Sequence, residues 1–84
     1  MSEQLLLVKK AIKGNEEAFL DLMHVHQEAL YRTAISFLKN EEDALEAVQE
    51  VTYRAFKHIG KLKEPAYFKT WIIRIMMNYC QDEI

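Results

Sequence analysis

The sequence is poor in the residues that cross-link small domains or interrupt helices, with one cysteine, one proline and two glycines among 84 residues. The single cysteine, Cys80, can form no disulfide within the chain, which excludes a disulfide-stapled fold and favours a reducing cytoplasm. So few glycines and prolines, with half of all residues hydrophobic, disfavour both an all-β and a disordered chain. The longest early apolar run, Leu5–Val8, is far too short for a membrane span or a signal peptide. We therefore expect one cytoplasmic helical domain without membrane insertion.

Net charge is also small, at −2, but it is unevenly distributed. Residues 41–50 contain five acidic side chains and no basic one. Residues 54–74 contain six basic side chains, against which only Glu64 is acidic. This separation predicts two different partners, a basic one for the first segment and a polyanion such as nucleic acid for the second.

Apolar side chains recur with the helical period along most of the chain and predict an all-α fold, a small bundle of four helices. Asn15 and Asn40 are expected N-caps, and Gly14 and Gly60 are expected helix stops. Ser2 is a plausible cap of the first helix, and Pro65 suits the first turn of the last one. The expected helices cover residues 3–13, 16–39, 41–59 and 65–82.

The third and fourth of these helices have faces of different character. On the third, the expected outer face contains acidic and amide side chains, with Val51 and Tyr53 at its rim. On the fourth, the polar residues are spaced by four, four and three positions and form one stripe, Thr70, Arg74, Asn78 and Gln81. The expected buried residues are Leu45, Val48, Ala55, Phe56 and Ile59 on the third helix, and Phe68, Trp71, Ile72, Ile75 and Tyr79 on the fourth.

The sequence gives little support to catalysis, a metal site or a cofactor. His24 and His26 are two positions apart, so a helix would point them in different directions, and His58 is remote from both. Cys80 has no activating histidine nearby in the sequence, and no glycine-rich phosphate loop is present. We expect no enzyme. Asp82 and Glu83 are unfavourable at a helix C-terminus, which suggests that the natural chain continues as part of a longer protein.

Two segments in particular resemble region 2 of the extracytoplasmic-function (ECF) group of bacterial sigma factors. Residues 44–50, Ala-Leu-Glu-Ala-Val-Gln-Glu, are similar to the family's Ala-x-Asp-x-Val-Gln-Glu segment. Residues 68–78, Phe-Lys-Thr-Trp-Ile-Ile-Arg-Ile-Met-Met-Asn, are similar to its Phe-x-Thr-Trp-Leu-x-x-Ile-x-x-Asn segment. The resemblance extends from Lys9 to Asp82, and two motifs in the right order and at the right separation make it specific. Glu46 replaces the usual aspartate, and the basic tail that follows the asparagine in the family is absent.

The resemblance implies an RNA polymerase sigma factor domain that acts in transcription initiation and spans residues 1–84. In the family the first motif docks on the β′ clamp of RNA polymerase core, and the loop and last helix recognise and melt the promoter −10 element on the non-template single strand. An anti-sigma factor is a further partner common in the family. Carried over residue by residue, the polymerase-binding residues are Leu45, Glu46, Gln49 and Glu50, with Phe56 as additional apolar contact, and the DNA-binding residues are Lys61, Lys63, Tyr67, Lys69, Arg74 and Asn78.

Two alternative functions remain open at this point. A helix-turn-helix DNA-binding module is disfavoured because the turn after Ile59 is long and the last helix begins with aromatic and apolar residues where base-reading polar ones should lie. A helical protein-interaction module would leave the basic loop without a role. A four-helix metalloenzyme is disfavoured because the paired Glu-x-x-His motifs are missing.

Overall fold

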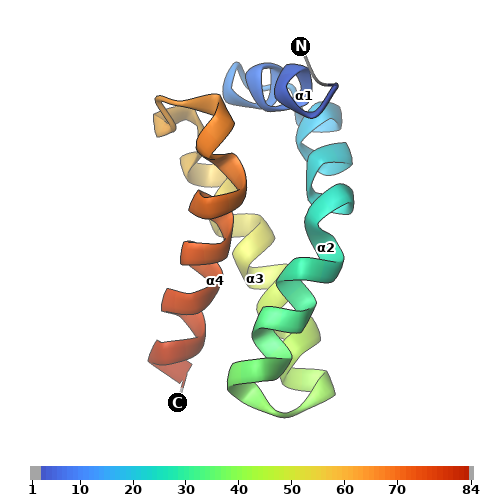
Figure 1. Cartoon of the computed structure of the whole chain (residues 1–84), viewed down its shortest axis with the longest axis vertical. Helices are drawn as coiled ribbons and strands as arrows, with labels where there is room; N and C mark the ends of the chain where they lie inside the picture. Colours follow the sequence, from blue (N-terminus) through green and yellow to red (C-terminus); the bar gives the residue numbers. More distant parts are fainter. Residues whose placement is uncertain (1–2, 84) are drawn as a thin grey trace.

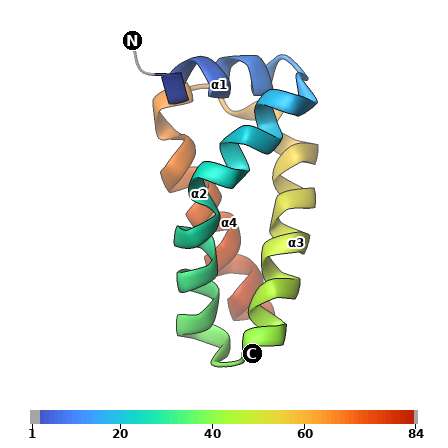
Figure 2. The ribbon, with the colours of Figure 1, turned by 90° about the vertical axis from the view of Figure 1, so that its right-hand side faces the viewer.

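The computed structural model describes residues 3–83, and among these it contains helices and no strand. Three helices run side by side along the 36 Å long axis, and the first lies across one end of them (Figures 1 and 2). The all-α bundle of four helices is therefore confirmed. A bilayer-spanning helix is absent from the described part of the chain. The elements are α1 (Glu3–Ile12), α2 (Glu16–Leu38), α3 (Glu41–His58), the 3₁₀ turns η1 (Ile59–Lys61) and η2 (Pro65–Tyr67), and α4 (Phe68–Glu83).

Helices α2 and α3 begin where their asparagine caps predict. The Oδ1 atom of Asn15 accepts a hydrogen bond from the backbone N–H of Ala18, and that of Asn40 accepts one from Asp43, each at 2.9 Å. Each cap satisfies one of the amide groups that a helix start leaves unpaired. The expected cap Ser2 lies outside the described residues. These caps fix the two turns, so the direction in which α2 and α3 enter the bundle is set locally.

Helix ends are equally well defined. Gly14 has φ +99°, a left-handed conformation that glycine adopts without steric cost, and it ends α1 as expected. Lys39 follows α2 with φ +55°, and its N–H donates to the carbonyl of Ile35. Pro65 begins η2, where the carboxylate of Glu64 accepts from the N–H of Ala66 at 3.2 Å. The connection between α3 and α4 is thus two tight 3₁₀ turns joined by a short extended segment.

The hydrophobic core lies between α2, α3 and α4, and α1 covers one end of it. Helix α2 contributes large side chains, among which Phe19, Leu22 and Leu30 are fully buried. Helix α4 contributes four residues at a spacing of four, which places them on one face. These four are Phe68, Ile72, Met76 and Cys80. The expected residues Trp71, Ile75 and Tyr79 are only partly buried and lie beside that face.

The expected buried face of α3 was wrong in part: Ala55 and Ile59 are buried as expected, but the large residues expected beside them are not. Leu45 is 52% exposed and Phe56 is 40% exposed, whereas Val51, expected at the outer rim, is fully buried. The interior positions are taken mainly by alanines, so the helix is rotated by about one residue, roughly 100°, from the expected orientation. Small inner side chains let α3 lie close to α2 and α4, which larger ones would prevent. The inner face of α3 consists of Ala44, Ala47, Val51 and Ala55.

Candidate partner-binding surfaces

The outer face of α3, defined here as five of the helix's exposed residues, combines large apolar side chains with polar ones. A helix that buries alanines and exposes leucine and aromatic residues has apolar surface that the fold itself does not use. Of the four expected polymerase-binding residues, three belong to this face. Its members are Leu45, Glu46, Gln49, Tyr53 and Phe56.

The fourth expected polymerase-binding residue, Glu50, lies at the edge of this face and already has a partner. Its Oε2 accepts a hydrogen bond from Nε of Arg54 at 3.0 Å. The guanidinium of Arg54 in turn lies 5.0 Å from the ring centroid of Tyr79 on α4. This chain of contacts ties α3 to α4. The spacing of four between Glu50 and Arg54 predicts such a pair, but it gives no sign of the tyrosine on another helix.

A shallow groove of about 500 Å³ lies beside the outer face, between α2 and α3. Leu45 and Val48 form its α3 side, and Tyr31 and Glu28 belong to its α2 side. The exposed face of α3 is therefore continuous with a partly apolar hollow rather than with flat solvent-facing surface. This gives a protein partner area to bury on two helices.

The basic loop holds three of the expected DNA-binding residues, and all three are exposed. Lys61 ends η1, Lys63 lies in the extended segment, and Tyr67 ends η2 with 48% of its surface accessible. An exposed aromatic ring flanked by cations is a suitable platform for an unpaired base and its phosphates. The loop follows α3 at the end opposite to its acidic start (Figure 1), whereas the outer face of α3 extends along the helix from Leu45 to Phe56.

On α4 the expected DNA-binding residues do not all face the same way. Arg74 and Asn78 are exposed and are four positions apart, so they share one side of the helix. Lys69 lies nine positions before Asn78, about two and a half turns, and therefore projects from the opposite side. There it lines a cavity together with Gln4 and His26. The structure thus separates Lys69 from the other α4 residues of the expected set.

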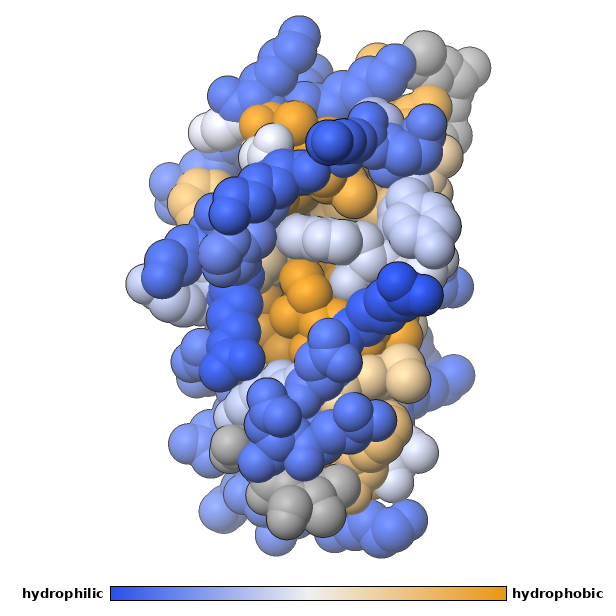
Figure 3. Space-filling model, turned by 90° about the vertical axis from the view of Figure 1, so that its left-hand side faces the viewer, coloured by the Kyte–Doolittle hydropathy of each residue, from blue (hydrophilic) through white to orange (hydrophobic). Residues whose placement is uncertain are grey.

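The face of the molecule on the α4 side has apolar side chains at its centre, framed by hydrophilic ones (Figure 3). The partly buried Trp71, Ile75 and Tyr79 belong to the flank of α4 that approaches α3, since Arg54 reaches Tyr79 there. A mixture of accessible aromatic edges and nearby cations suits single-stranded nucleic acid better than the intact duplex. Among the described residues, no three side chains of the histidine, cysteine or acidic type are grouped as a metal site would require.

Comparison with known proteins agrees with the two sequence motifs. The Sigma-70 region 2 family matches residues 22–84, which include most of α2 and all of α3, the loop and the described part of α4. The chain belongs to the sigma-70 region 2 family. Both candidate surfaces of this region 2 domain lie within the matched residues. No match to a solved structure reaches significance.

Three of the relatives that resemble this region 2 chain are ECF sigma factors. It is 30% identical over 77 residues to the ECF RNA polymerase sigma factor SigW of Bacillus subtilis, covering 92% of this chain and 41% of that protein. It is 30% identical to SigM of Mycobacterium tuberculosis, with 93% and 40% covered. It is 31% identical to the sigma-E factor of Escherichia coli, with 98% and 44% covered. The chain spans about two fifths of the length of these relatives.

Proposed function

We propose that this region 2 domain acts in transcription initiation by joining RNA polymerase core to a melted promoter. The outer face of α3 binds the β′ clamp. The basic loop captures an unpaired base of the −10 element on the non-template strand, and the Arg74–Asn78 side of α4 contacts the same strand beside it. The polymerase performs the chemistry, and the domain supplies binding energy alone.

The observation that carries the proposal is the outer face of α3. Glu46 is exposed and forms no ion pair within residues 3–82, and Leu45 beside it is half exposed. Neither residue contributes to the core, so both are free to meet a partner with basic side chains and an apolar patch. Charge-assisted pairing to arginine favours such an acidic helix. An anti-sigma factor that covers this face would block polymerase binding.

The DNA half of the proposal follows from the energetics of a flipped base. Extruding a base costs a few kcal/mol, and stacking on an aromatic ring returns roughly 1–3 kcal/mol per base. Tyr67 supplies the ring, and Lys61 and Lys63 supply phosphate contacts. Asn78 lies about three helical turns further along, roughly 16 Å away, and supplies an amide for the edge of a neighbouring base. With so few cations, the DNA affinity of the domain alone is weak, and polymerase must present it to the promoter.

The two proposed surfaces are tested one at a time, each with a substitution on the surface and a control substitution elsewhere on the domain. Glu46→Lys should lower the affinity for polymerase core roughly tenfold, about 1.4 kcal/mol, since it places a cation against a basic partner. Asp21→Lys reverses an exposed charge on α2 and should leave that affinity unchanged. Affinity is measured by fluorescence anisotropy, with circular dichroism to confirm that each variant is folded.

The second pair of variants addresses DNA. Asn78→Ala should keep full polymerase binding but weaken capture of a single-stranded −10 oligonucleotide by the complex, whereas Gln81→Ala, further along the same exposed stripe, should not. If Glu46→Lys left polymerase binding intact, the proposal would fail. Tight binding of the free domain to duplex DNA would favour a helix-turn-helix mode instead.

A further inference from the structure

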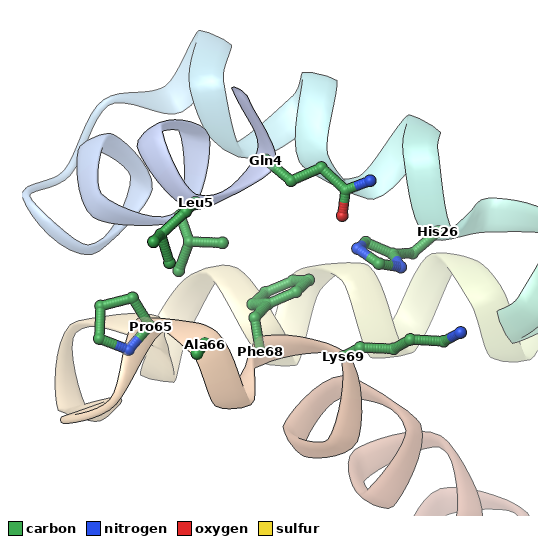
Figure 4. Close-up of a pocket in the computed structure, with 8 residues that line it drawn as sticks. Gln4, Leu5, His26, Pro65, Ala66, Phe68 and Lys69 are labelled. Carbon is green, nitrogen blue, oxygen red and sulfur yellow. The ribbon is translucent and has the colours of Figure 1, made fainter. Parts of the chain in front are cut away.

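Two hollows of the domain differ in how much surface they leave for another molecule. The hollow between α1, α2 and the start of α4 is lined by Phe68, which is only 2% exposed and packs against the ring of His26 with centroids 5.4 Å apart (Figure 4). The groove between α2 and α3 is larger, at about 500 Å³ against 260 Å³, and lies beside the outer face of α3. Of the two, only the groove adjoins apolar surface that the fold leaves unused.

Four residues of α3 follow one line along the side of the helix that faces away from the core. Leu45, Gln49, Thr52 and Phe56 are spaced by four, three and four positions, the spacing at which one helix packs lengthwise against another. The line is apolar at both ends, where Leu45 and Phe56 are 52% and 40% exposed, and polar in the middle. A stripe that only faced solvent would be polar along its whole length.

This line reads the same from either end, in spacing and in character. When a second copy of the chain lies antiparallel across it, Leu45 faces Phe56 of the second copy, and Gln49 faces Thr52 of the second copy. The hydroxyl of Thr52 donates to the carbonyl of Val48, and its oxygen can still accept from the amide of Gln49. A two-fold axis relates the copies, so the same surface serves as both partners.

The charges beside this line favour the same arrangement. Glu46 and Lys57 flank it on the Tyr53 side, where Nζ of Lys57 lies 5.6 Å from the ring centroid of Tyr53. They are as far apart in sequence as Leu45 and Phe56, so the antiparallel arrangement brings Glu46 of each copy to Lys57 of the other. Glu42 and Lys61, one turn further out at either end, meet in the same way. A parallel arrangement would set like charges against each other.

Phe56 is held in position before any partner arrives. Its ring packs against Phe19 of α2, with centroids 5.1 Å apart, and part of it stays exposed. Little side-chain freedom is therefore lost when a partner covers it. Leu45, which it meets on the second copy, borders the groove together with Val48 and Tyr31, so the contact extends from α3 towards α2.

Glu50 lies near the two-fold axis, where it faces Glu50 of the second copy. Its carboxylate is already paired with the guanidinium of Arg54 at 3.0 Å, which offsets the repulsion between the copies. It also lies at the edge of the outer face and not on the line itself. This like-charge contact is thus neutralised within each copy.

We propose that two copies of the chain associate through the outer faces of α3, as an antiparallel dimer related by a two-fold axis. The dimer covers Leu45 and Glu46, so a copy within it cannot bind polymerase core. This consequence rests on the proposed function, whereas the dimer itself rests on the spacing and charge of α3. An interface one helix wide lies at the low end of specific interfaces, below about 1,200 Å², so the dimer is weak and reversible. Polymerase then draws monomers from it by mass action.

The first experiment measures the mass of the chain by sedimentation equilibrium between about 1 and 300 µM, a range that brackets a dimer of micromolar Kd. We expect the dimer fraction to rise with concentration, and the dimer to weaken roughly 3- to 10-fold when salt rises from about 0.05 to about 0.5 M. Leu45→Ala should weaken it roughly fivefold. Val25→Ala shortens a similarly exposed residue of α2 that does not line the groove, and should leave the dimer unchanged.

Charge exchange tests the arrangement of the two copies. Glu46→Lys and Lys57→Glu should each weaken self-association roughly tenfold, because each sets like charges against each other across the axis. An equimolar mixture of the two variants should regain the dimer, because opposite charges then meet between unlike copies. Asp21→Lys, on α2, should leave self-association unchanged. All these side chains are exposed, and circular dichroism confirms that each variant is folded.

Three outcomes would overturn the proposal. The chain could remain monomeric over the whole concentration range. Val25→Ala could weaken self-association as much as Leu45→Ala does, which would place the contact on α2. The mixture of Glu46→Lys and Lys57→Glu could form no more dimer than either variant alone, which would contradict the antiparallel arrangement.

A chain with both Glu46→Lys and Lys57→Glu distinguishes failure of this inference from failure of the proposed function. It should dimerise as the parent chain does, since the two exchanges compensate each other across the axis, but it should bind polymerase core more weakly, since a cation replaces Glu46. If it dimerises and also binds core as tightly as the parent chain, the dimer stands and the proposed function is wrong. If the parent chain is monomeric and Glu46→Lys loses core binding, the dimer is wrong and the proposed function stands.

Discussion

The two faces of α3 differ in a way that inverts the usual amphipathic helix. Its inner face is built mostly of alanine, with Val51 as the largest side chain, and is fully buried. Its outer face has leucine, tyrosine and phenylalanine, and all of them are exposed. The difference teaches that the hydrophobic content of α3 serves two purposes. Small residues allow close helix packing within the domain, and large residues remain for contact with another molecule.

The charges of α3 divide in the same manner. Glu41, Glu42 and Asp43 lie in its first turn and Lys57 in its last, where each stabilises the helix dipole. These four charges would be expected in any well-made helix. Glu46 lies beyond the first turn, is exposed, and has no such local explanation. Its role therefore has to be sought outside the domain.

The largest expected effect comes from enlarging the inner face. Ala47→Leu should lower the free energy of unfolding by about 1–3 kcal/mol, because the added carbons have no space between α3 and its neighbours. Urea unfolding followed by circular dichroism measures it. Leu45→Ala, which removes a large side chain two positions away on the outer face, should change stability by no more than about 0.5 kcal/mol. Equal effects of the two changes would remove the distinction between the faces.

The next effect should appear in binding rather than in stability. Leu45→Ala should weaken association with polymerase core by about 1 kcal/mol, or roughly fivefold, because the leucine is the aliphatic anchor of the outer face. Titration of labelled polymerase core with the variant measures it. Leu20→Ala removes a similarly exposed leucine from α2 and should have no such effect. A weaker association for the second variant than for the first would place the contact on α2 instead.

These two changes also show what the sequence could and could not predict. The caps Asn15 and Asn40 depend on local chemistry, so the starts of α2 and α3 were predicted correctly. The polar stripe from Thr70 to Gln81 is exposed as predicted, because polar residues at helical spacing leave little choice of face. For α3, a periodic pattern ranks residues by hydrophobicity and ignores size, so Leu45 and Phe56 were expected inside. Alanine is favoured at the inner positions of α3 only because the neighbouring helices lie close to it, and the sequence pattern does not contain that distance.

For the candidate site too, spacing along one helix predicted some groupings of residues, and the packing of the helices decided the others. Spacing along one helix is enough to group Glu46 with Gln49, and Arg74 with Asn78. It did not show that Lys69 faces His26 across the bundle, because that contact depends on how α4 packs against α2. The cavity beside them was missed altogether. Its one sequence signal was a histidine at an inner position of α2.

A smaller effect is expected at the edge between the faces, where Glu50 pairs with Arg54. A double-mutant cycle with Glu50→Gln and Arg54→Gln should give a coupling of about 0.3–0.5 kcal/mol, as for other pairs at a spacing of four. Unfolding free energies at low salt supply the four values, and high salt should reduce the coupling. The pair Glu28–Arg32 on α2 is more exposed and lacks a stacked tyrosine. A larger coupling there would show that the Tyr79 contact adds nothing.

The smallest expected effect is on the pH dependence of stability. It compares two histidines of α2, one on the inner face and one on the outer face. Because the pKa of His26 in the folded chain is below its ordinary value of 6.5, the unfolded chain binds more protons in the range between the two. The free energy of unfolding should therefore fall as pH decreases from 6.5 towards the folded-state pKa. Urea unfolding at about pH 7.5 and about pH 5.5 measures this fall.

The matched variants decide whether His26 is responsible. His26→Gln removes the group that must stay neutral inside, so its stability should fall less between the two pH values than that of the parent chain. His24→Gln changes an exposed histidine on the same helix and should leave the fall unchanged. If both variants kept the parent's pH dependence, the buried imidazole would not be the cause. A smaller fall in the His26 variant alone would show that protonation of the buried imidazole is what destabilises the folded chain at low pH.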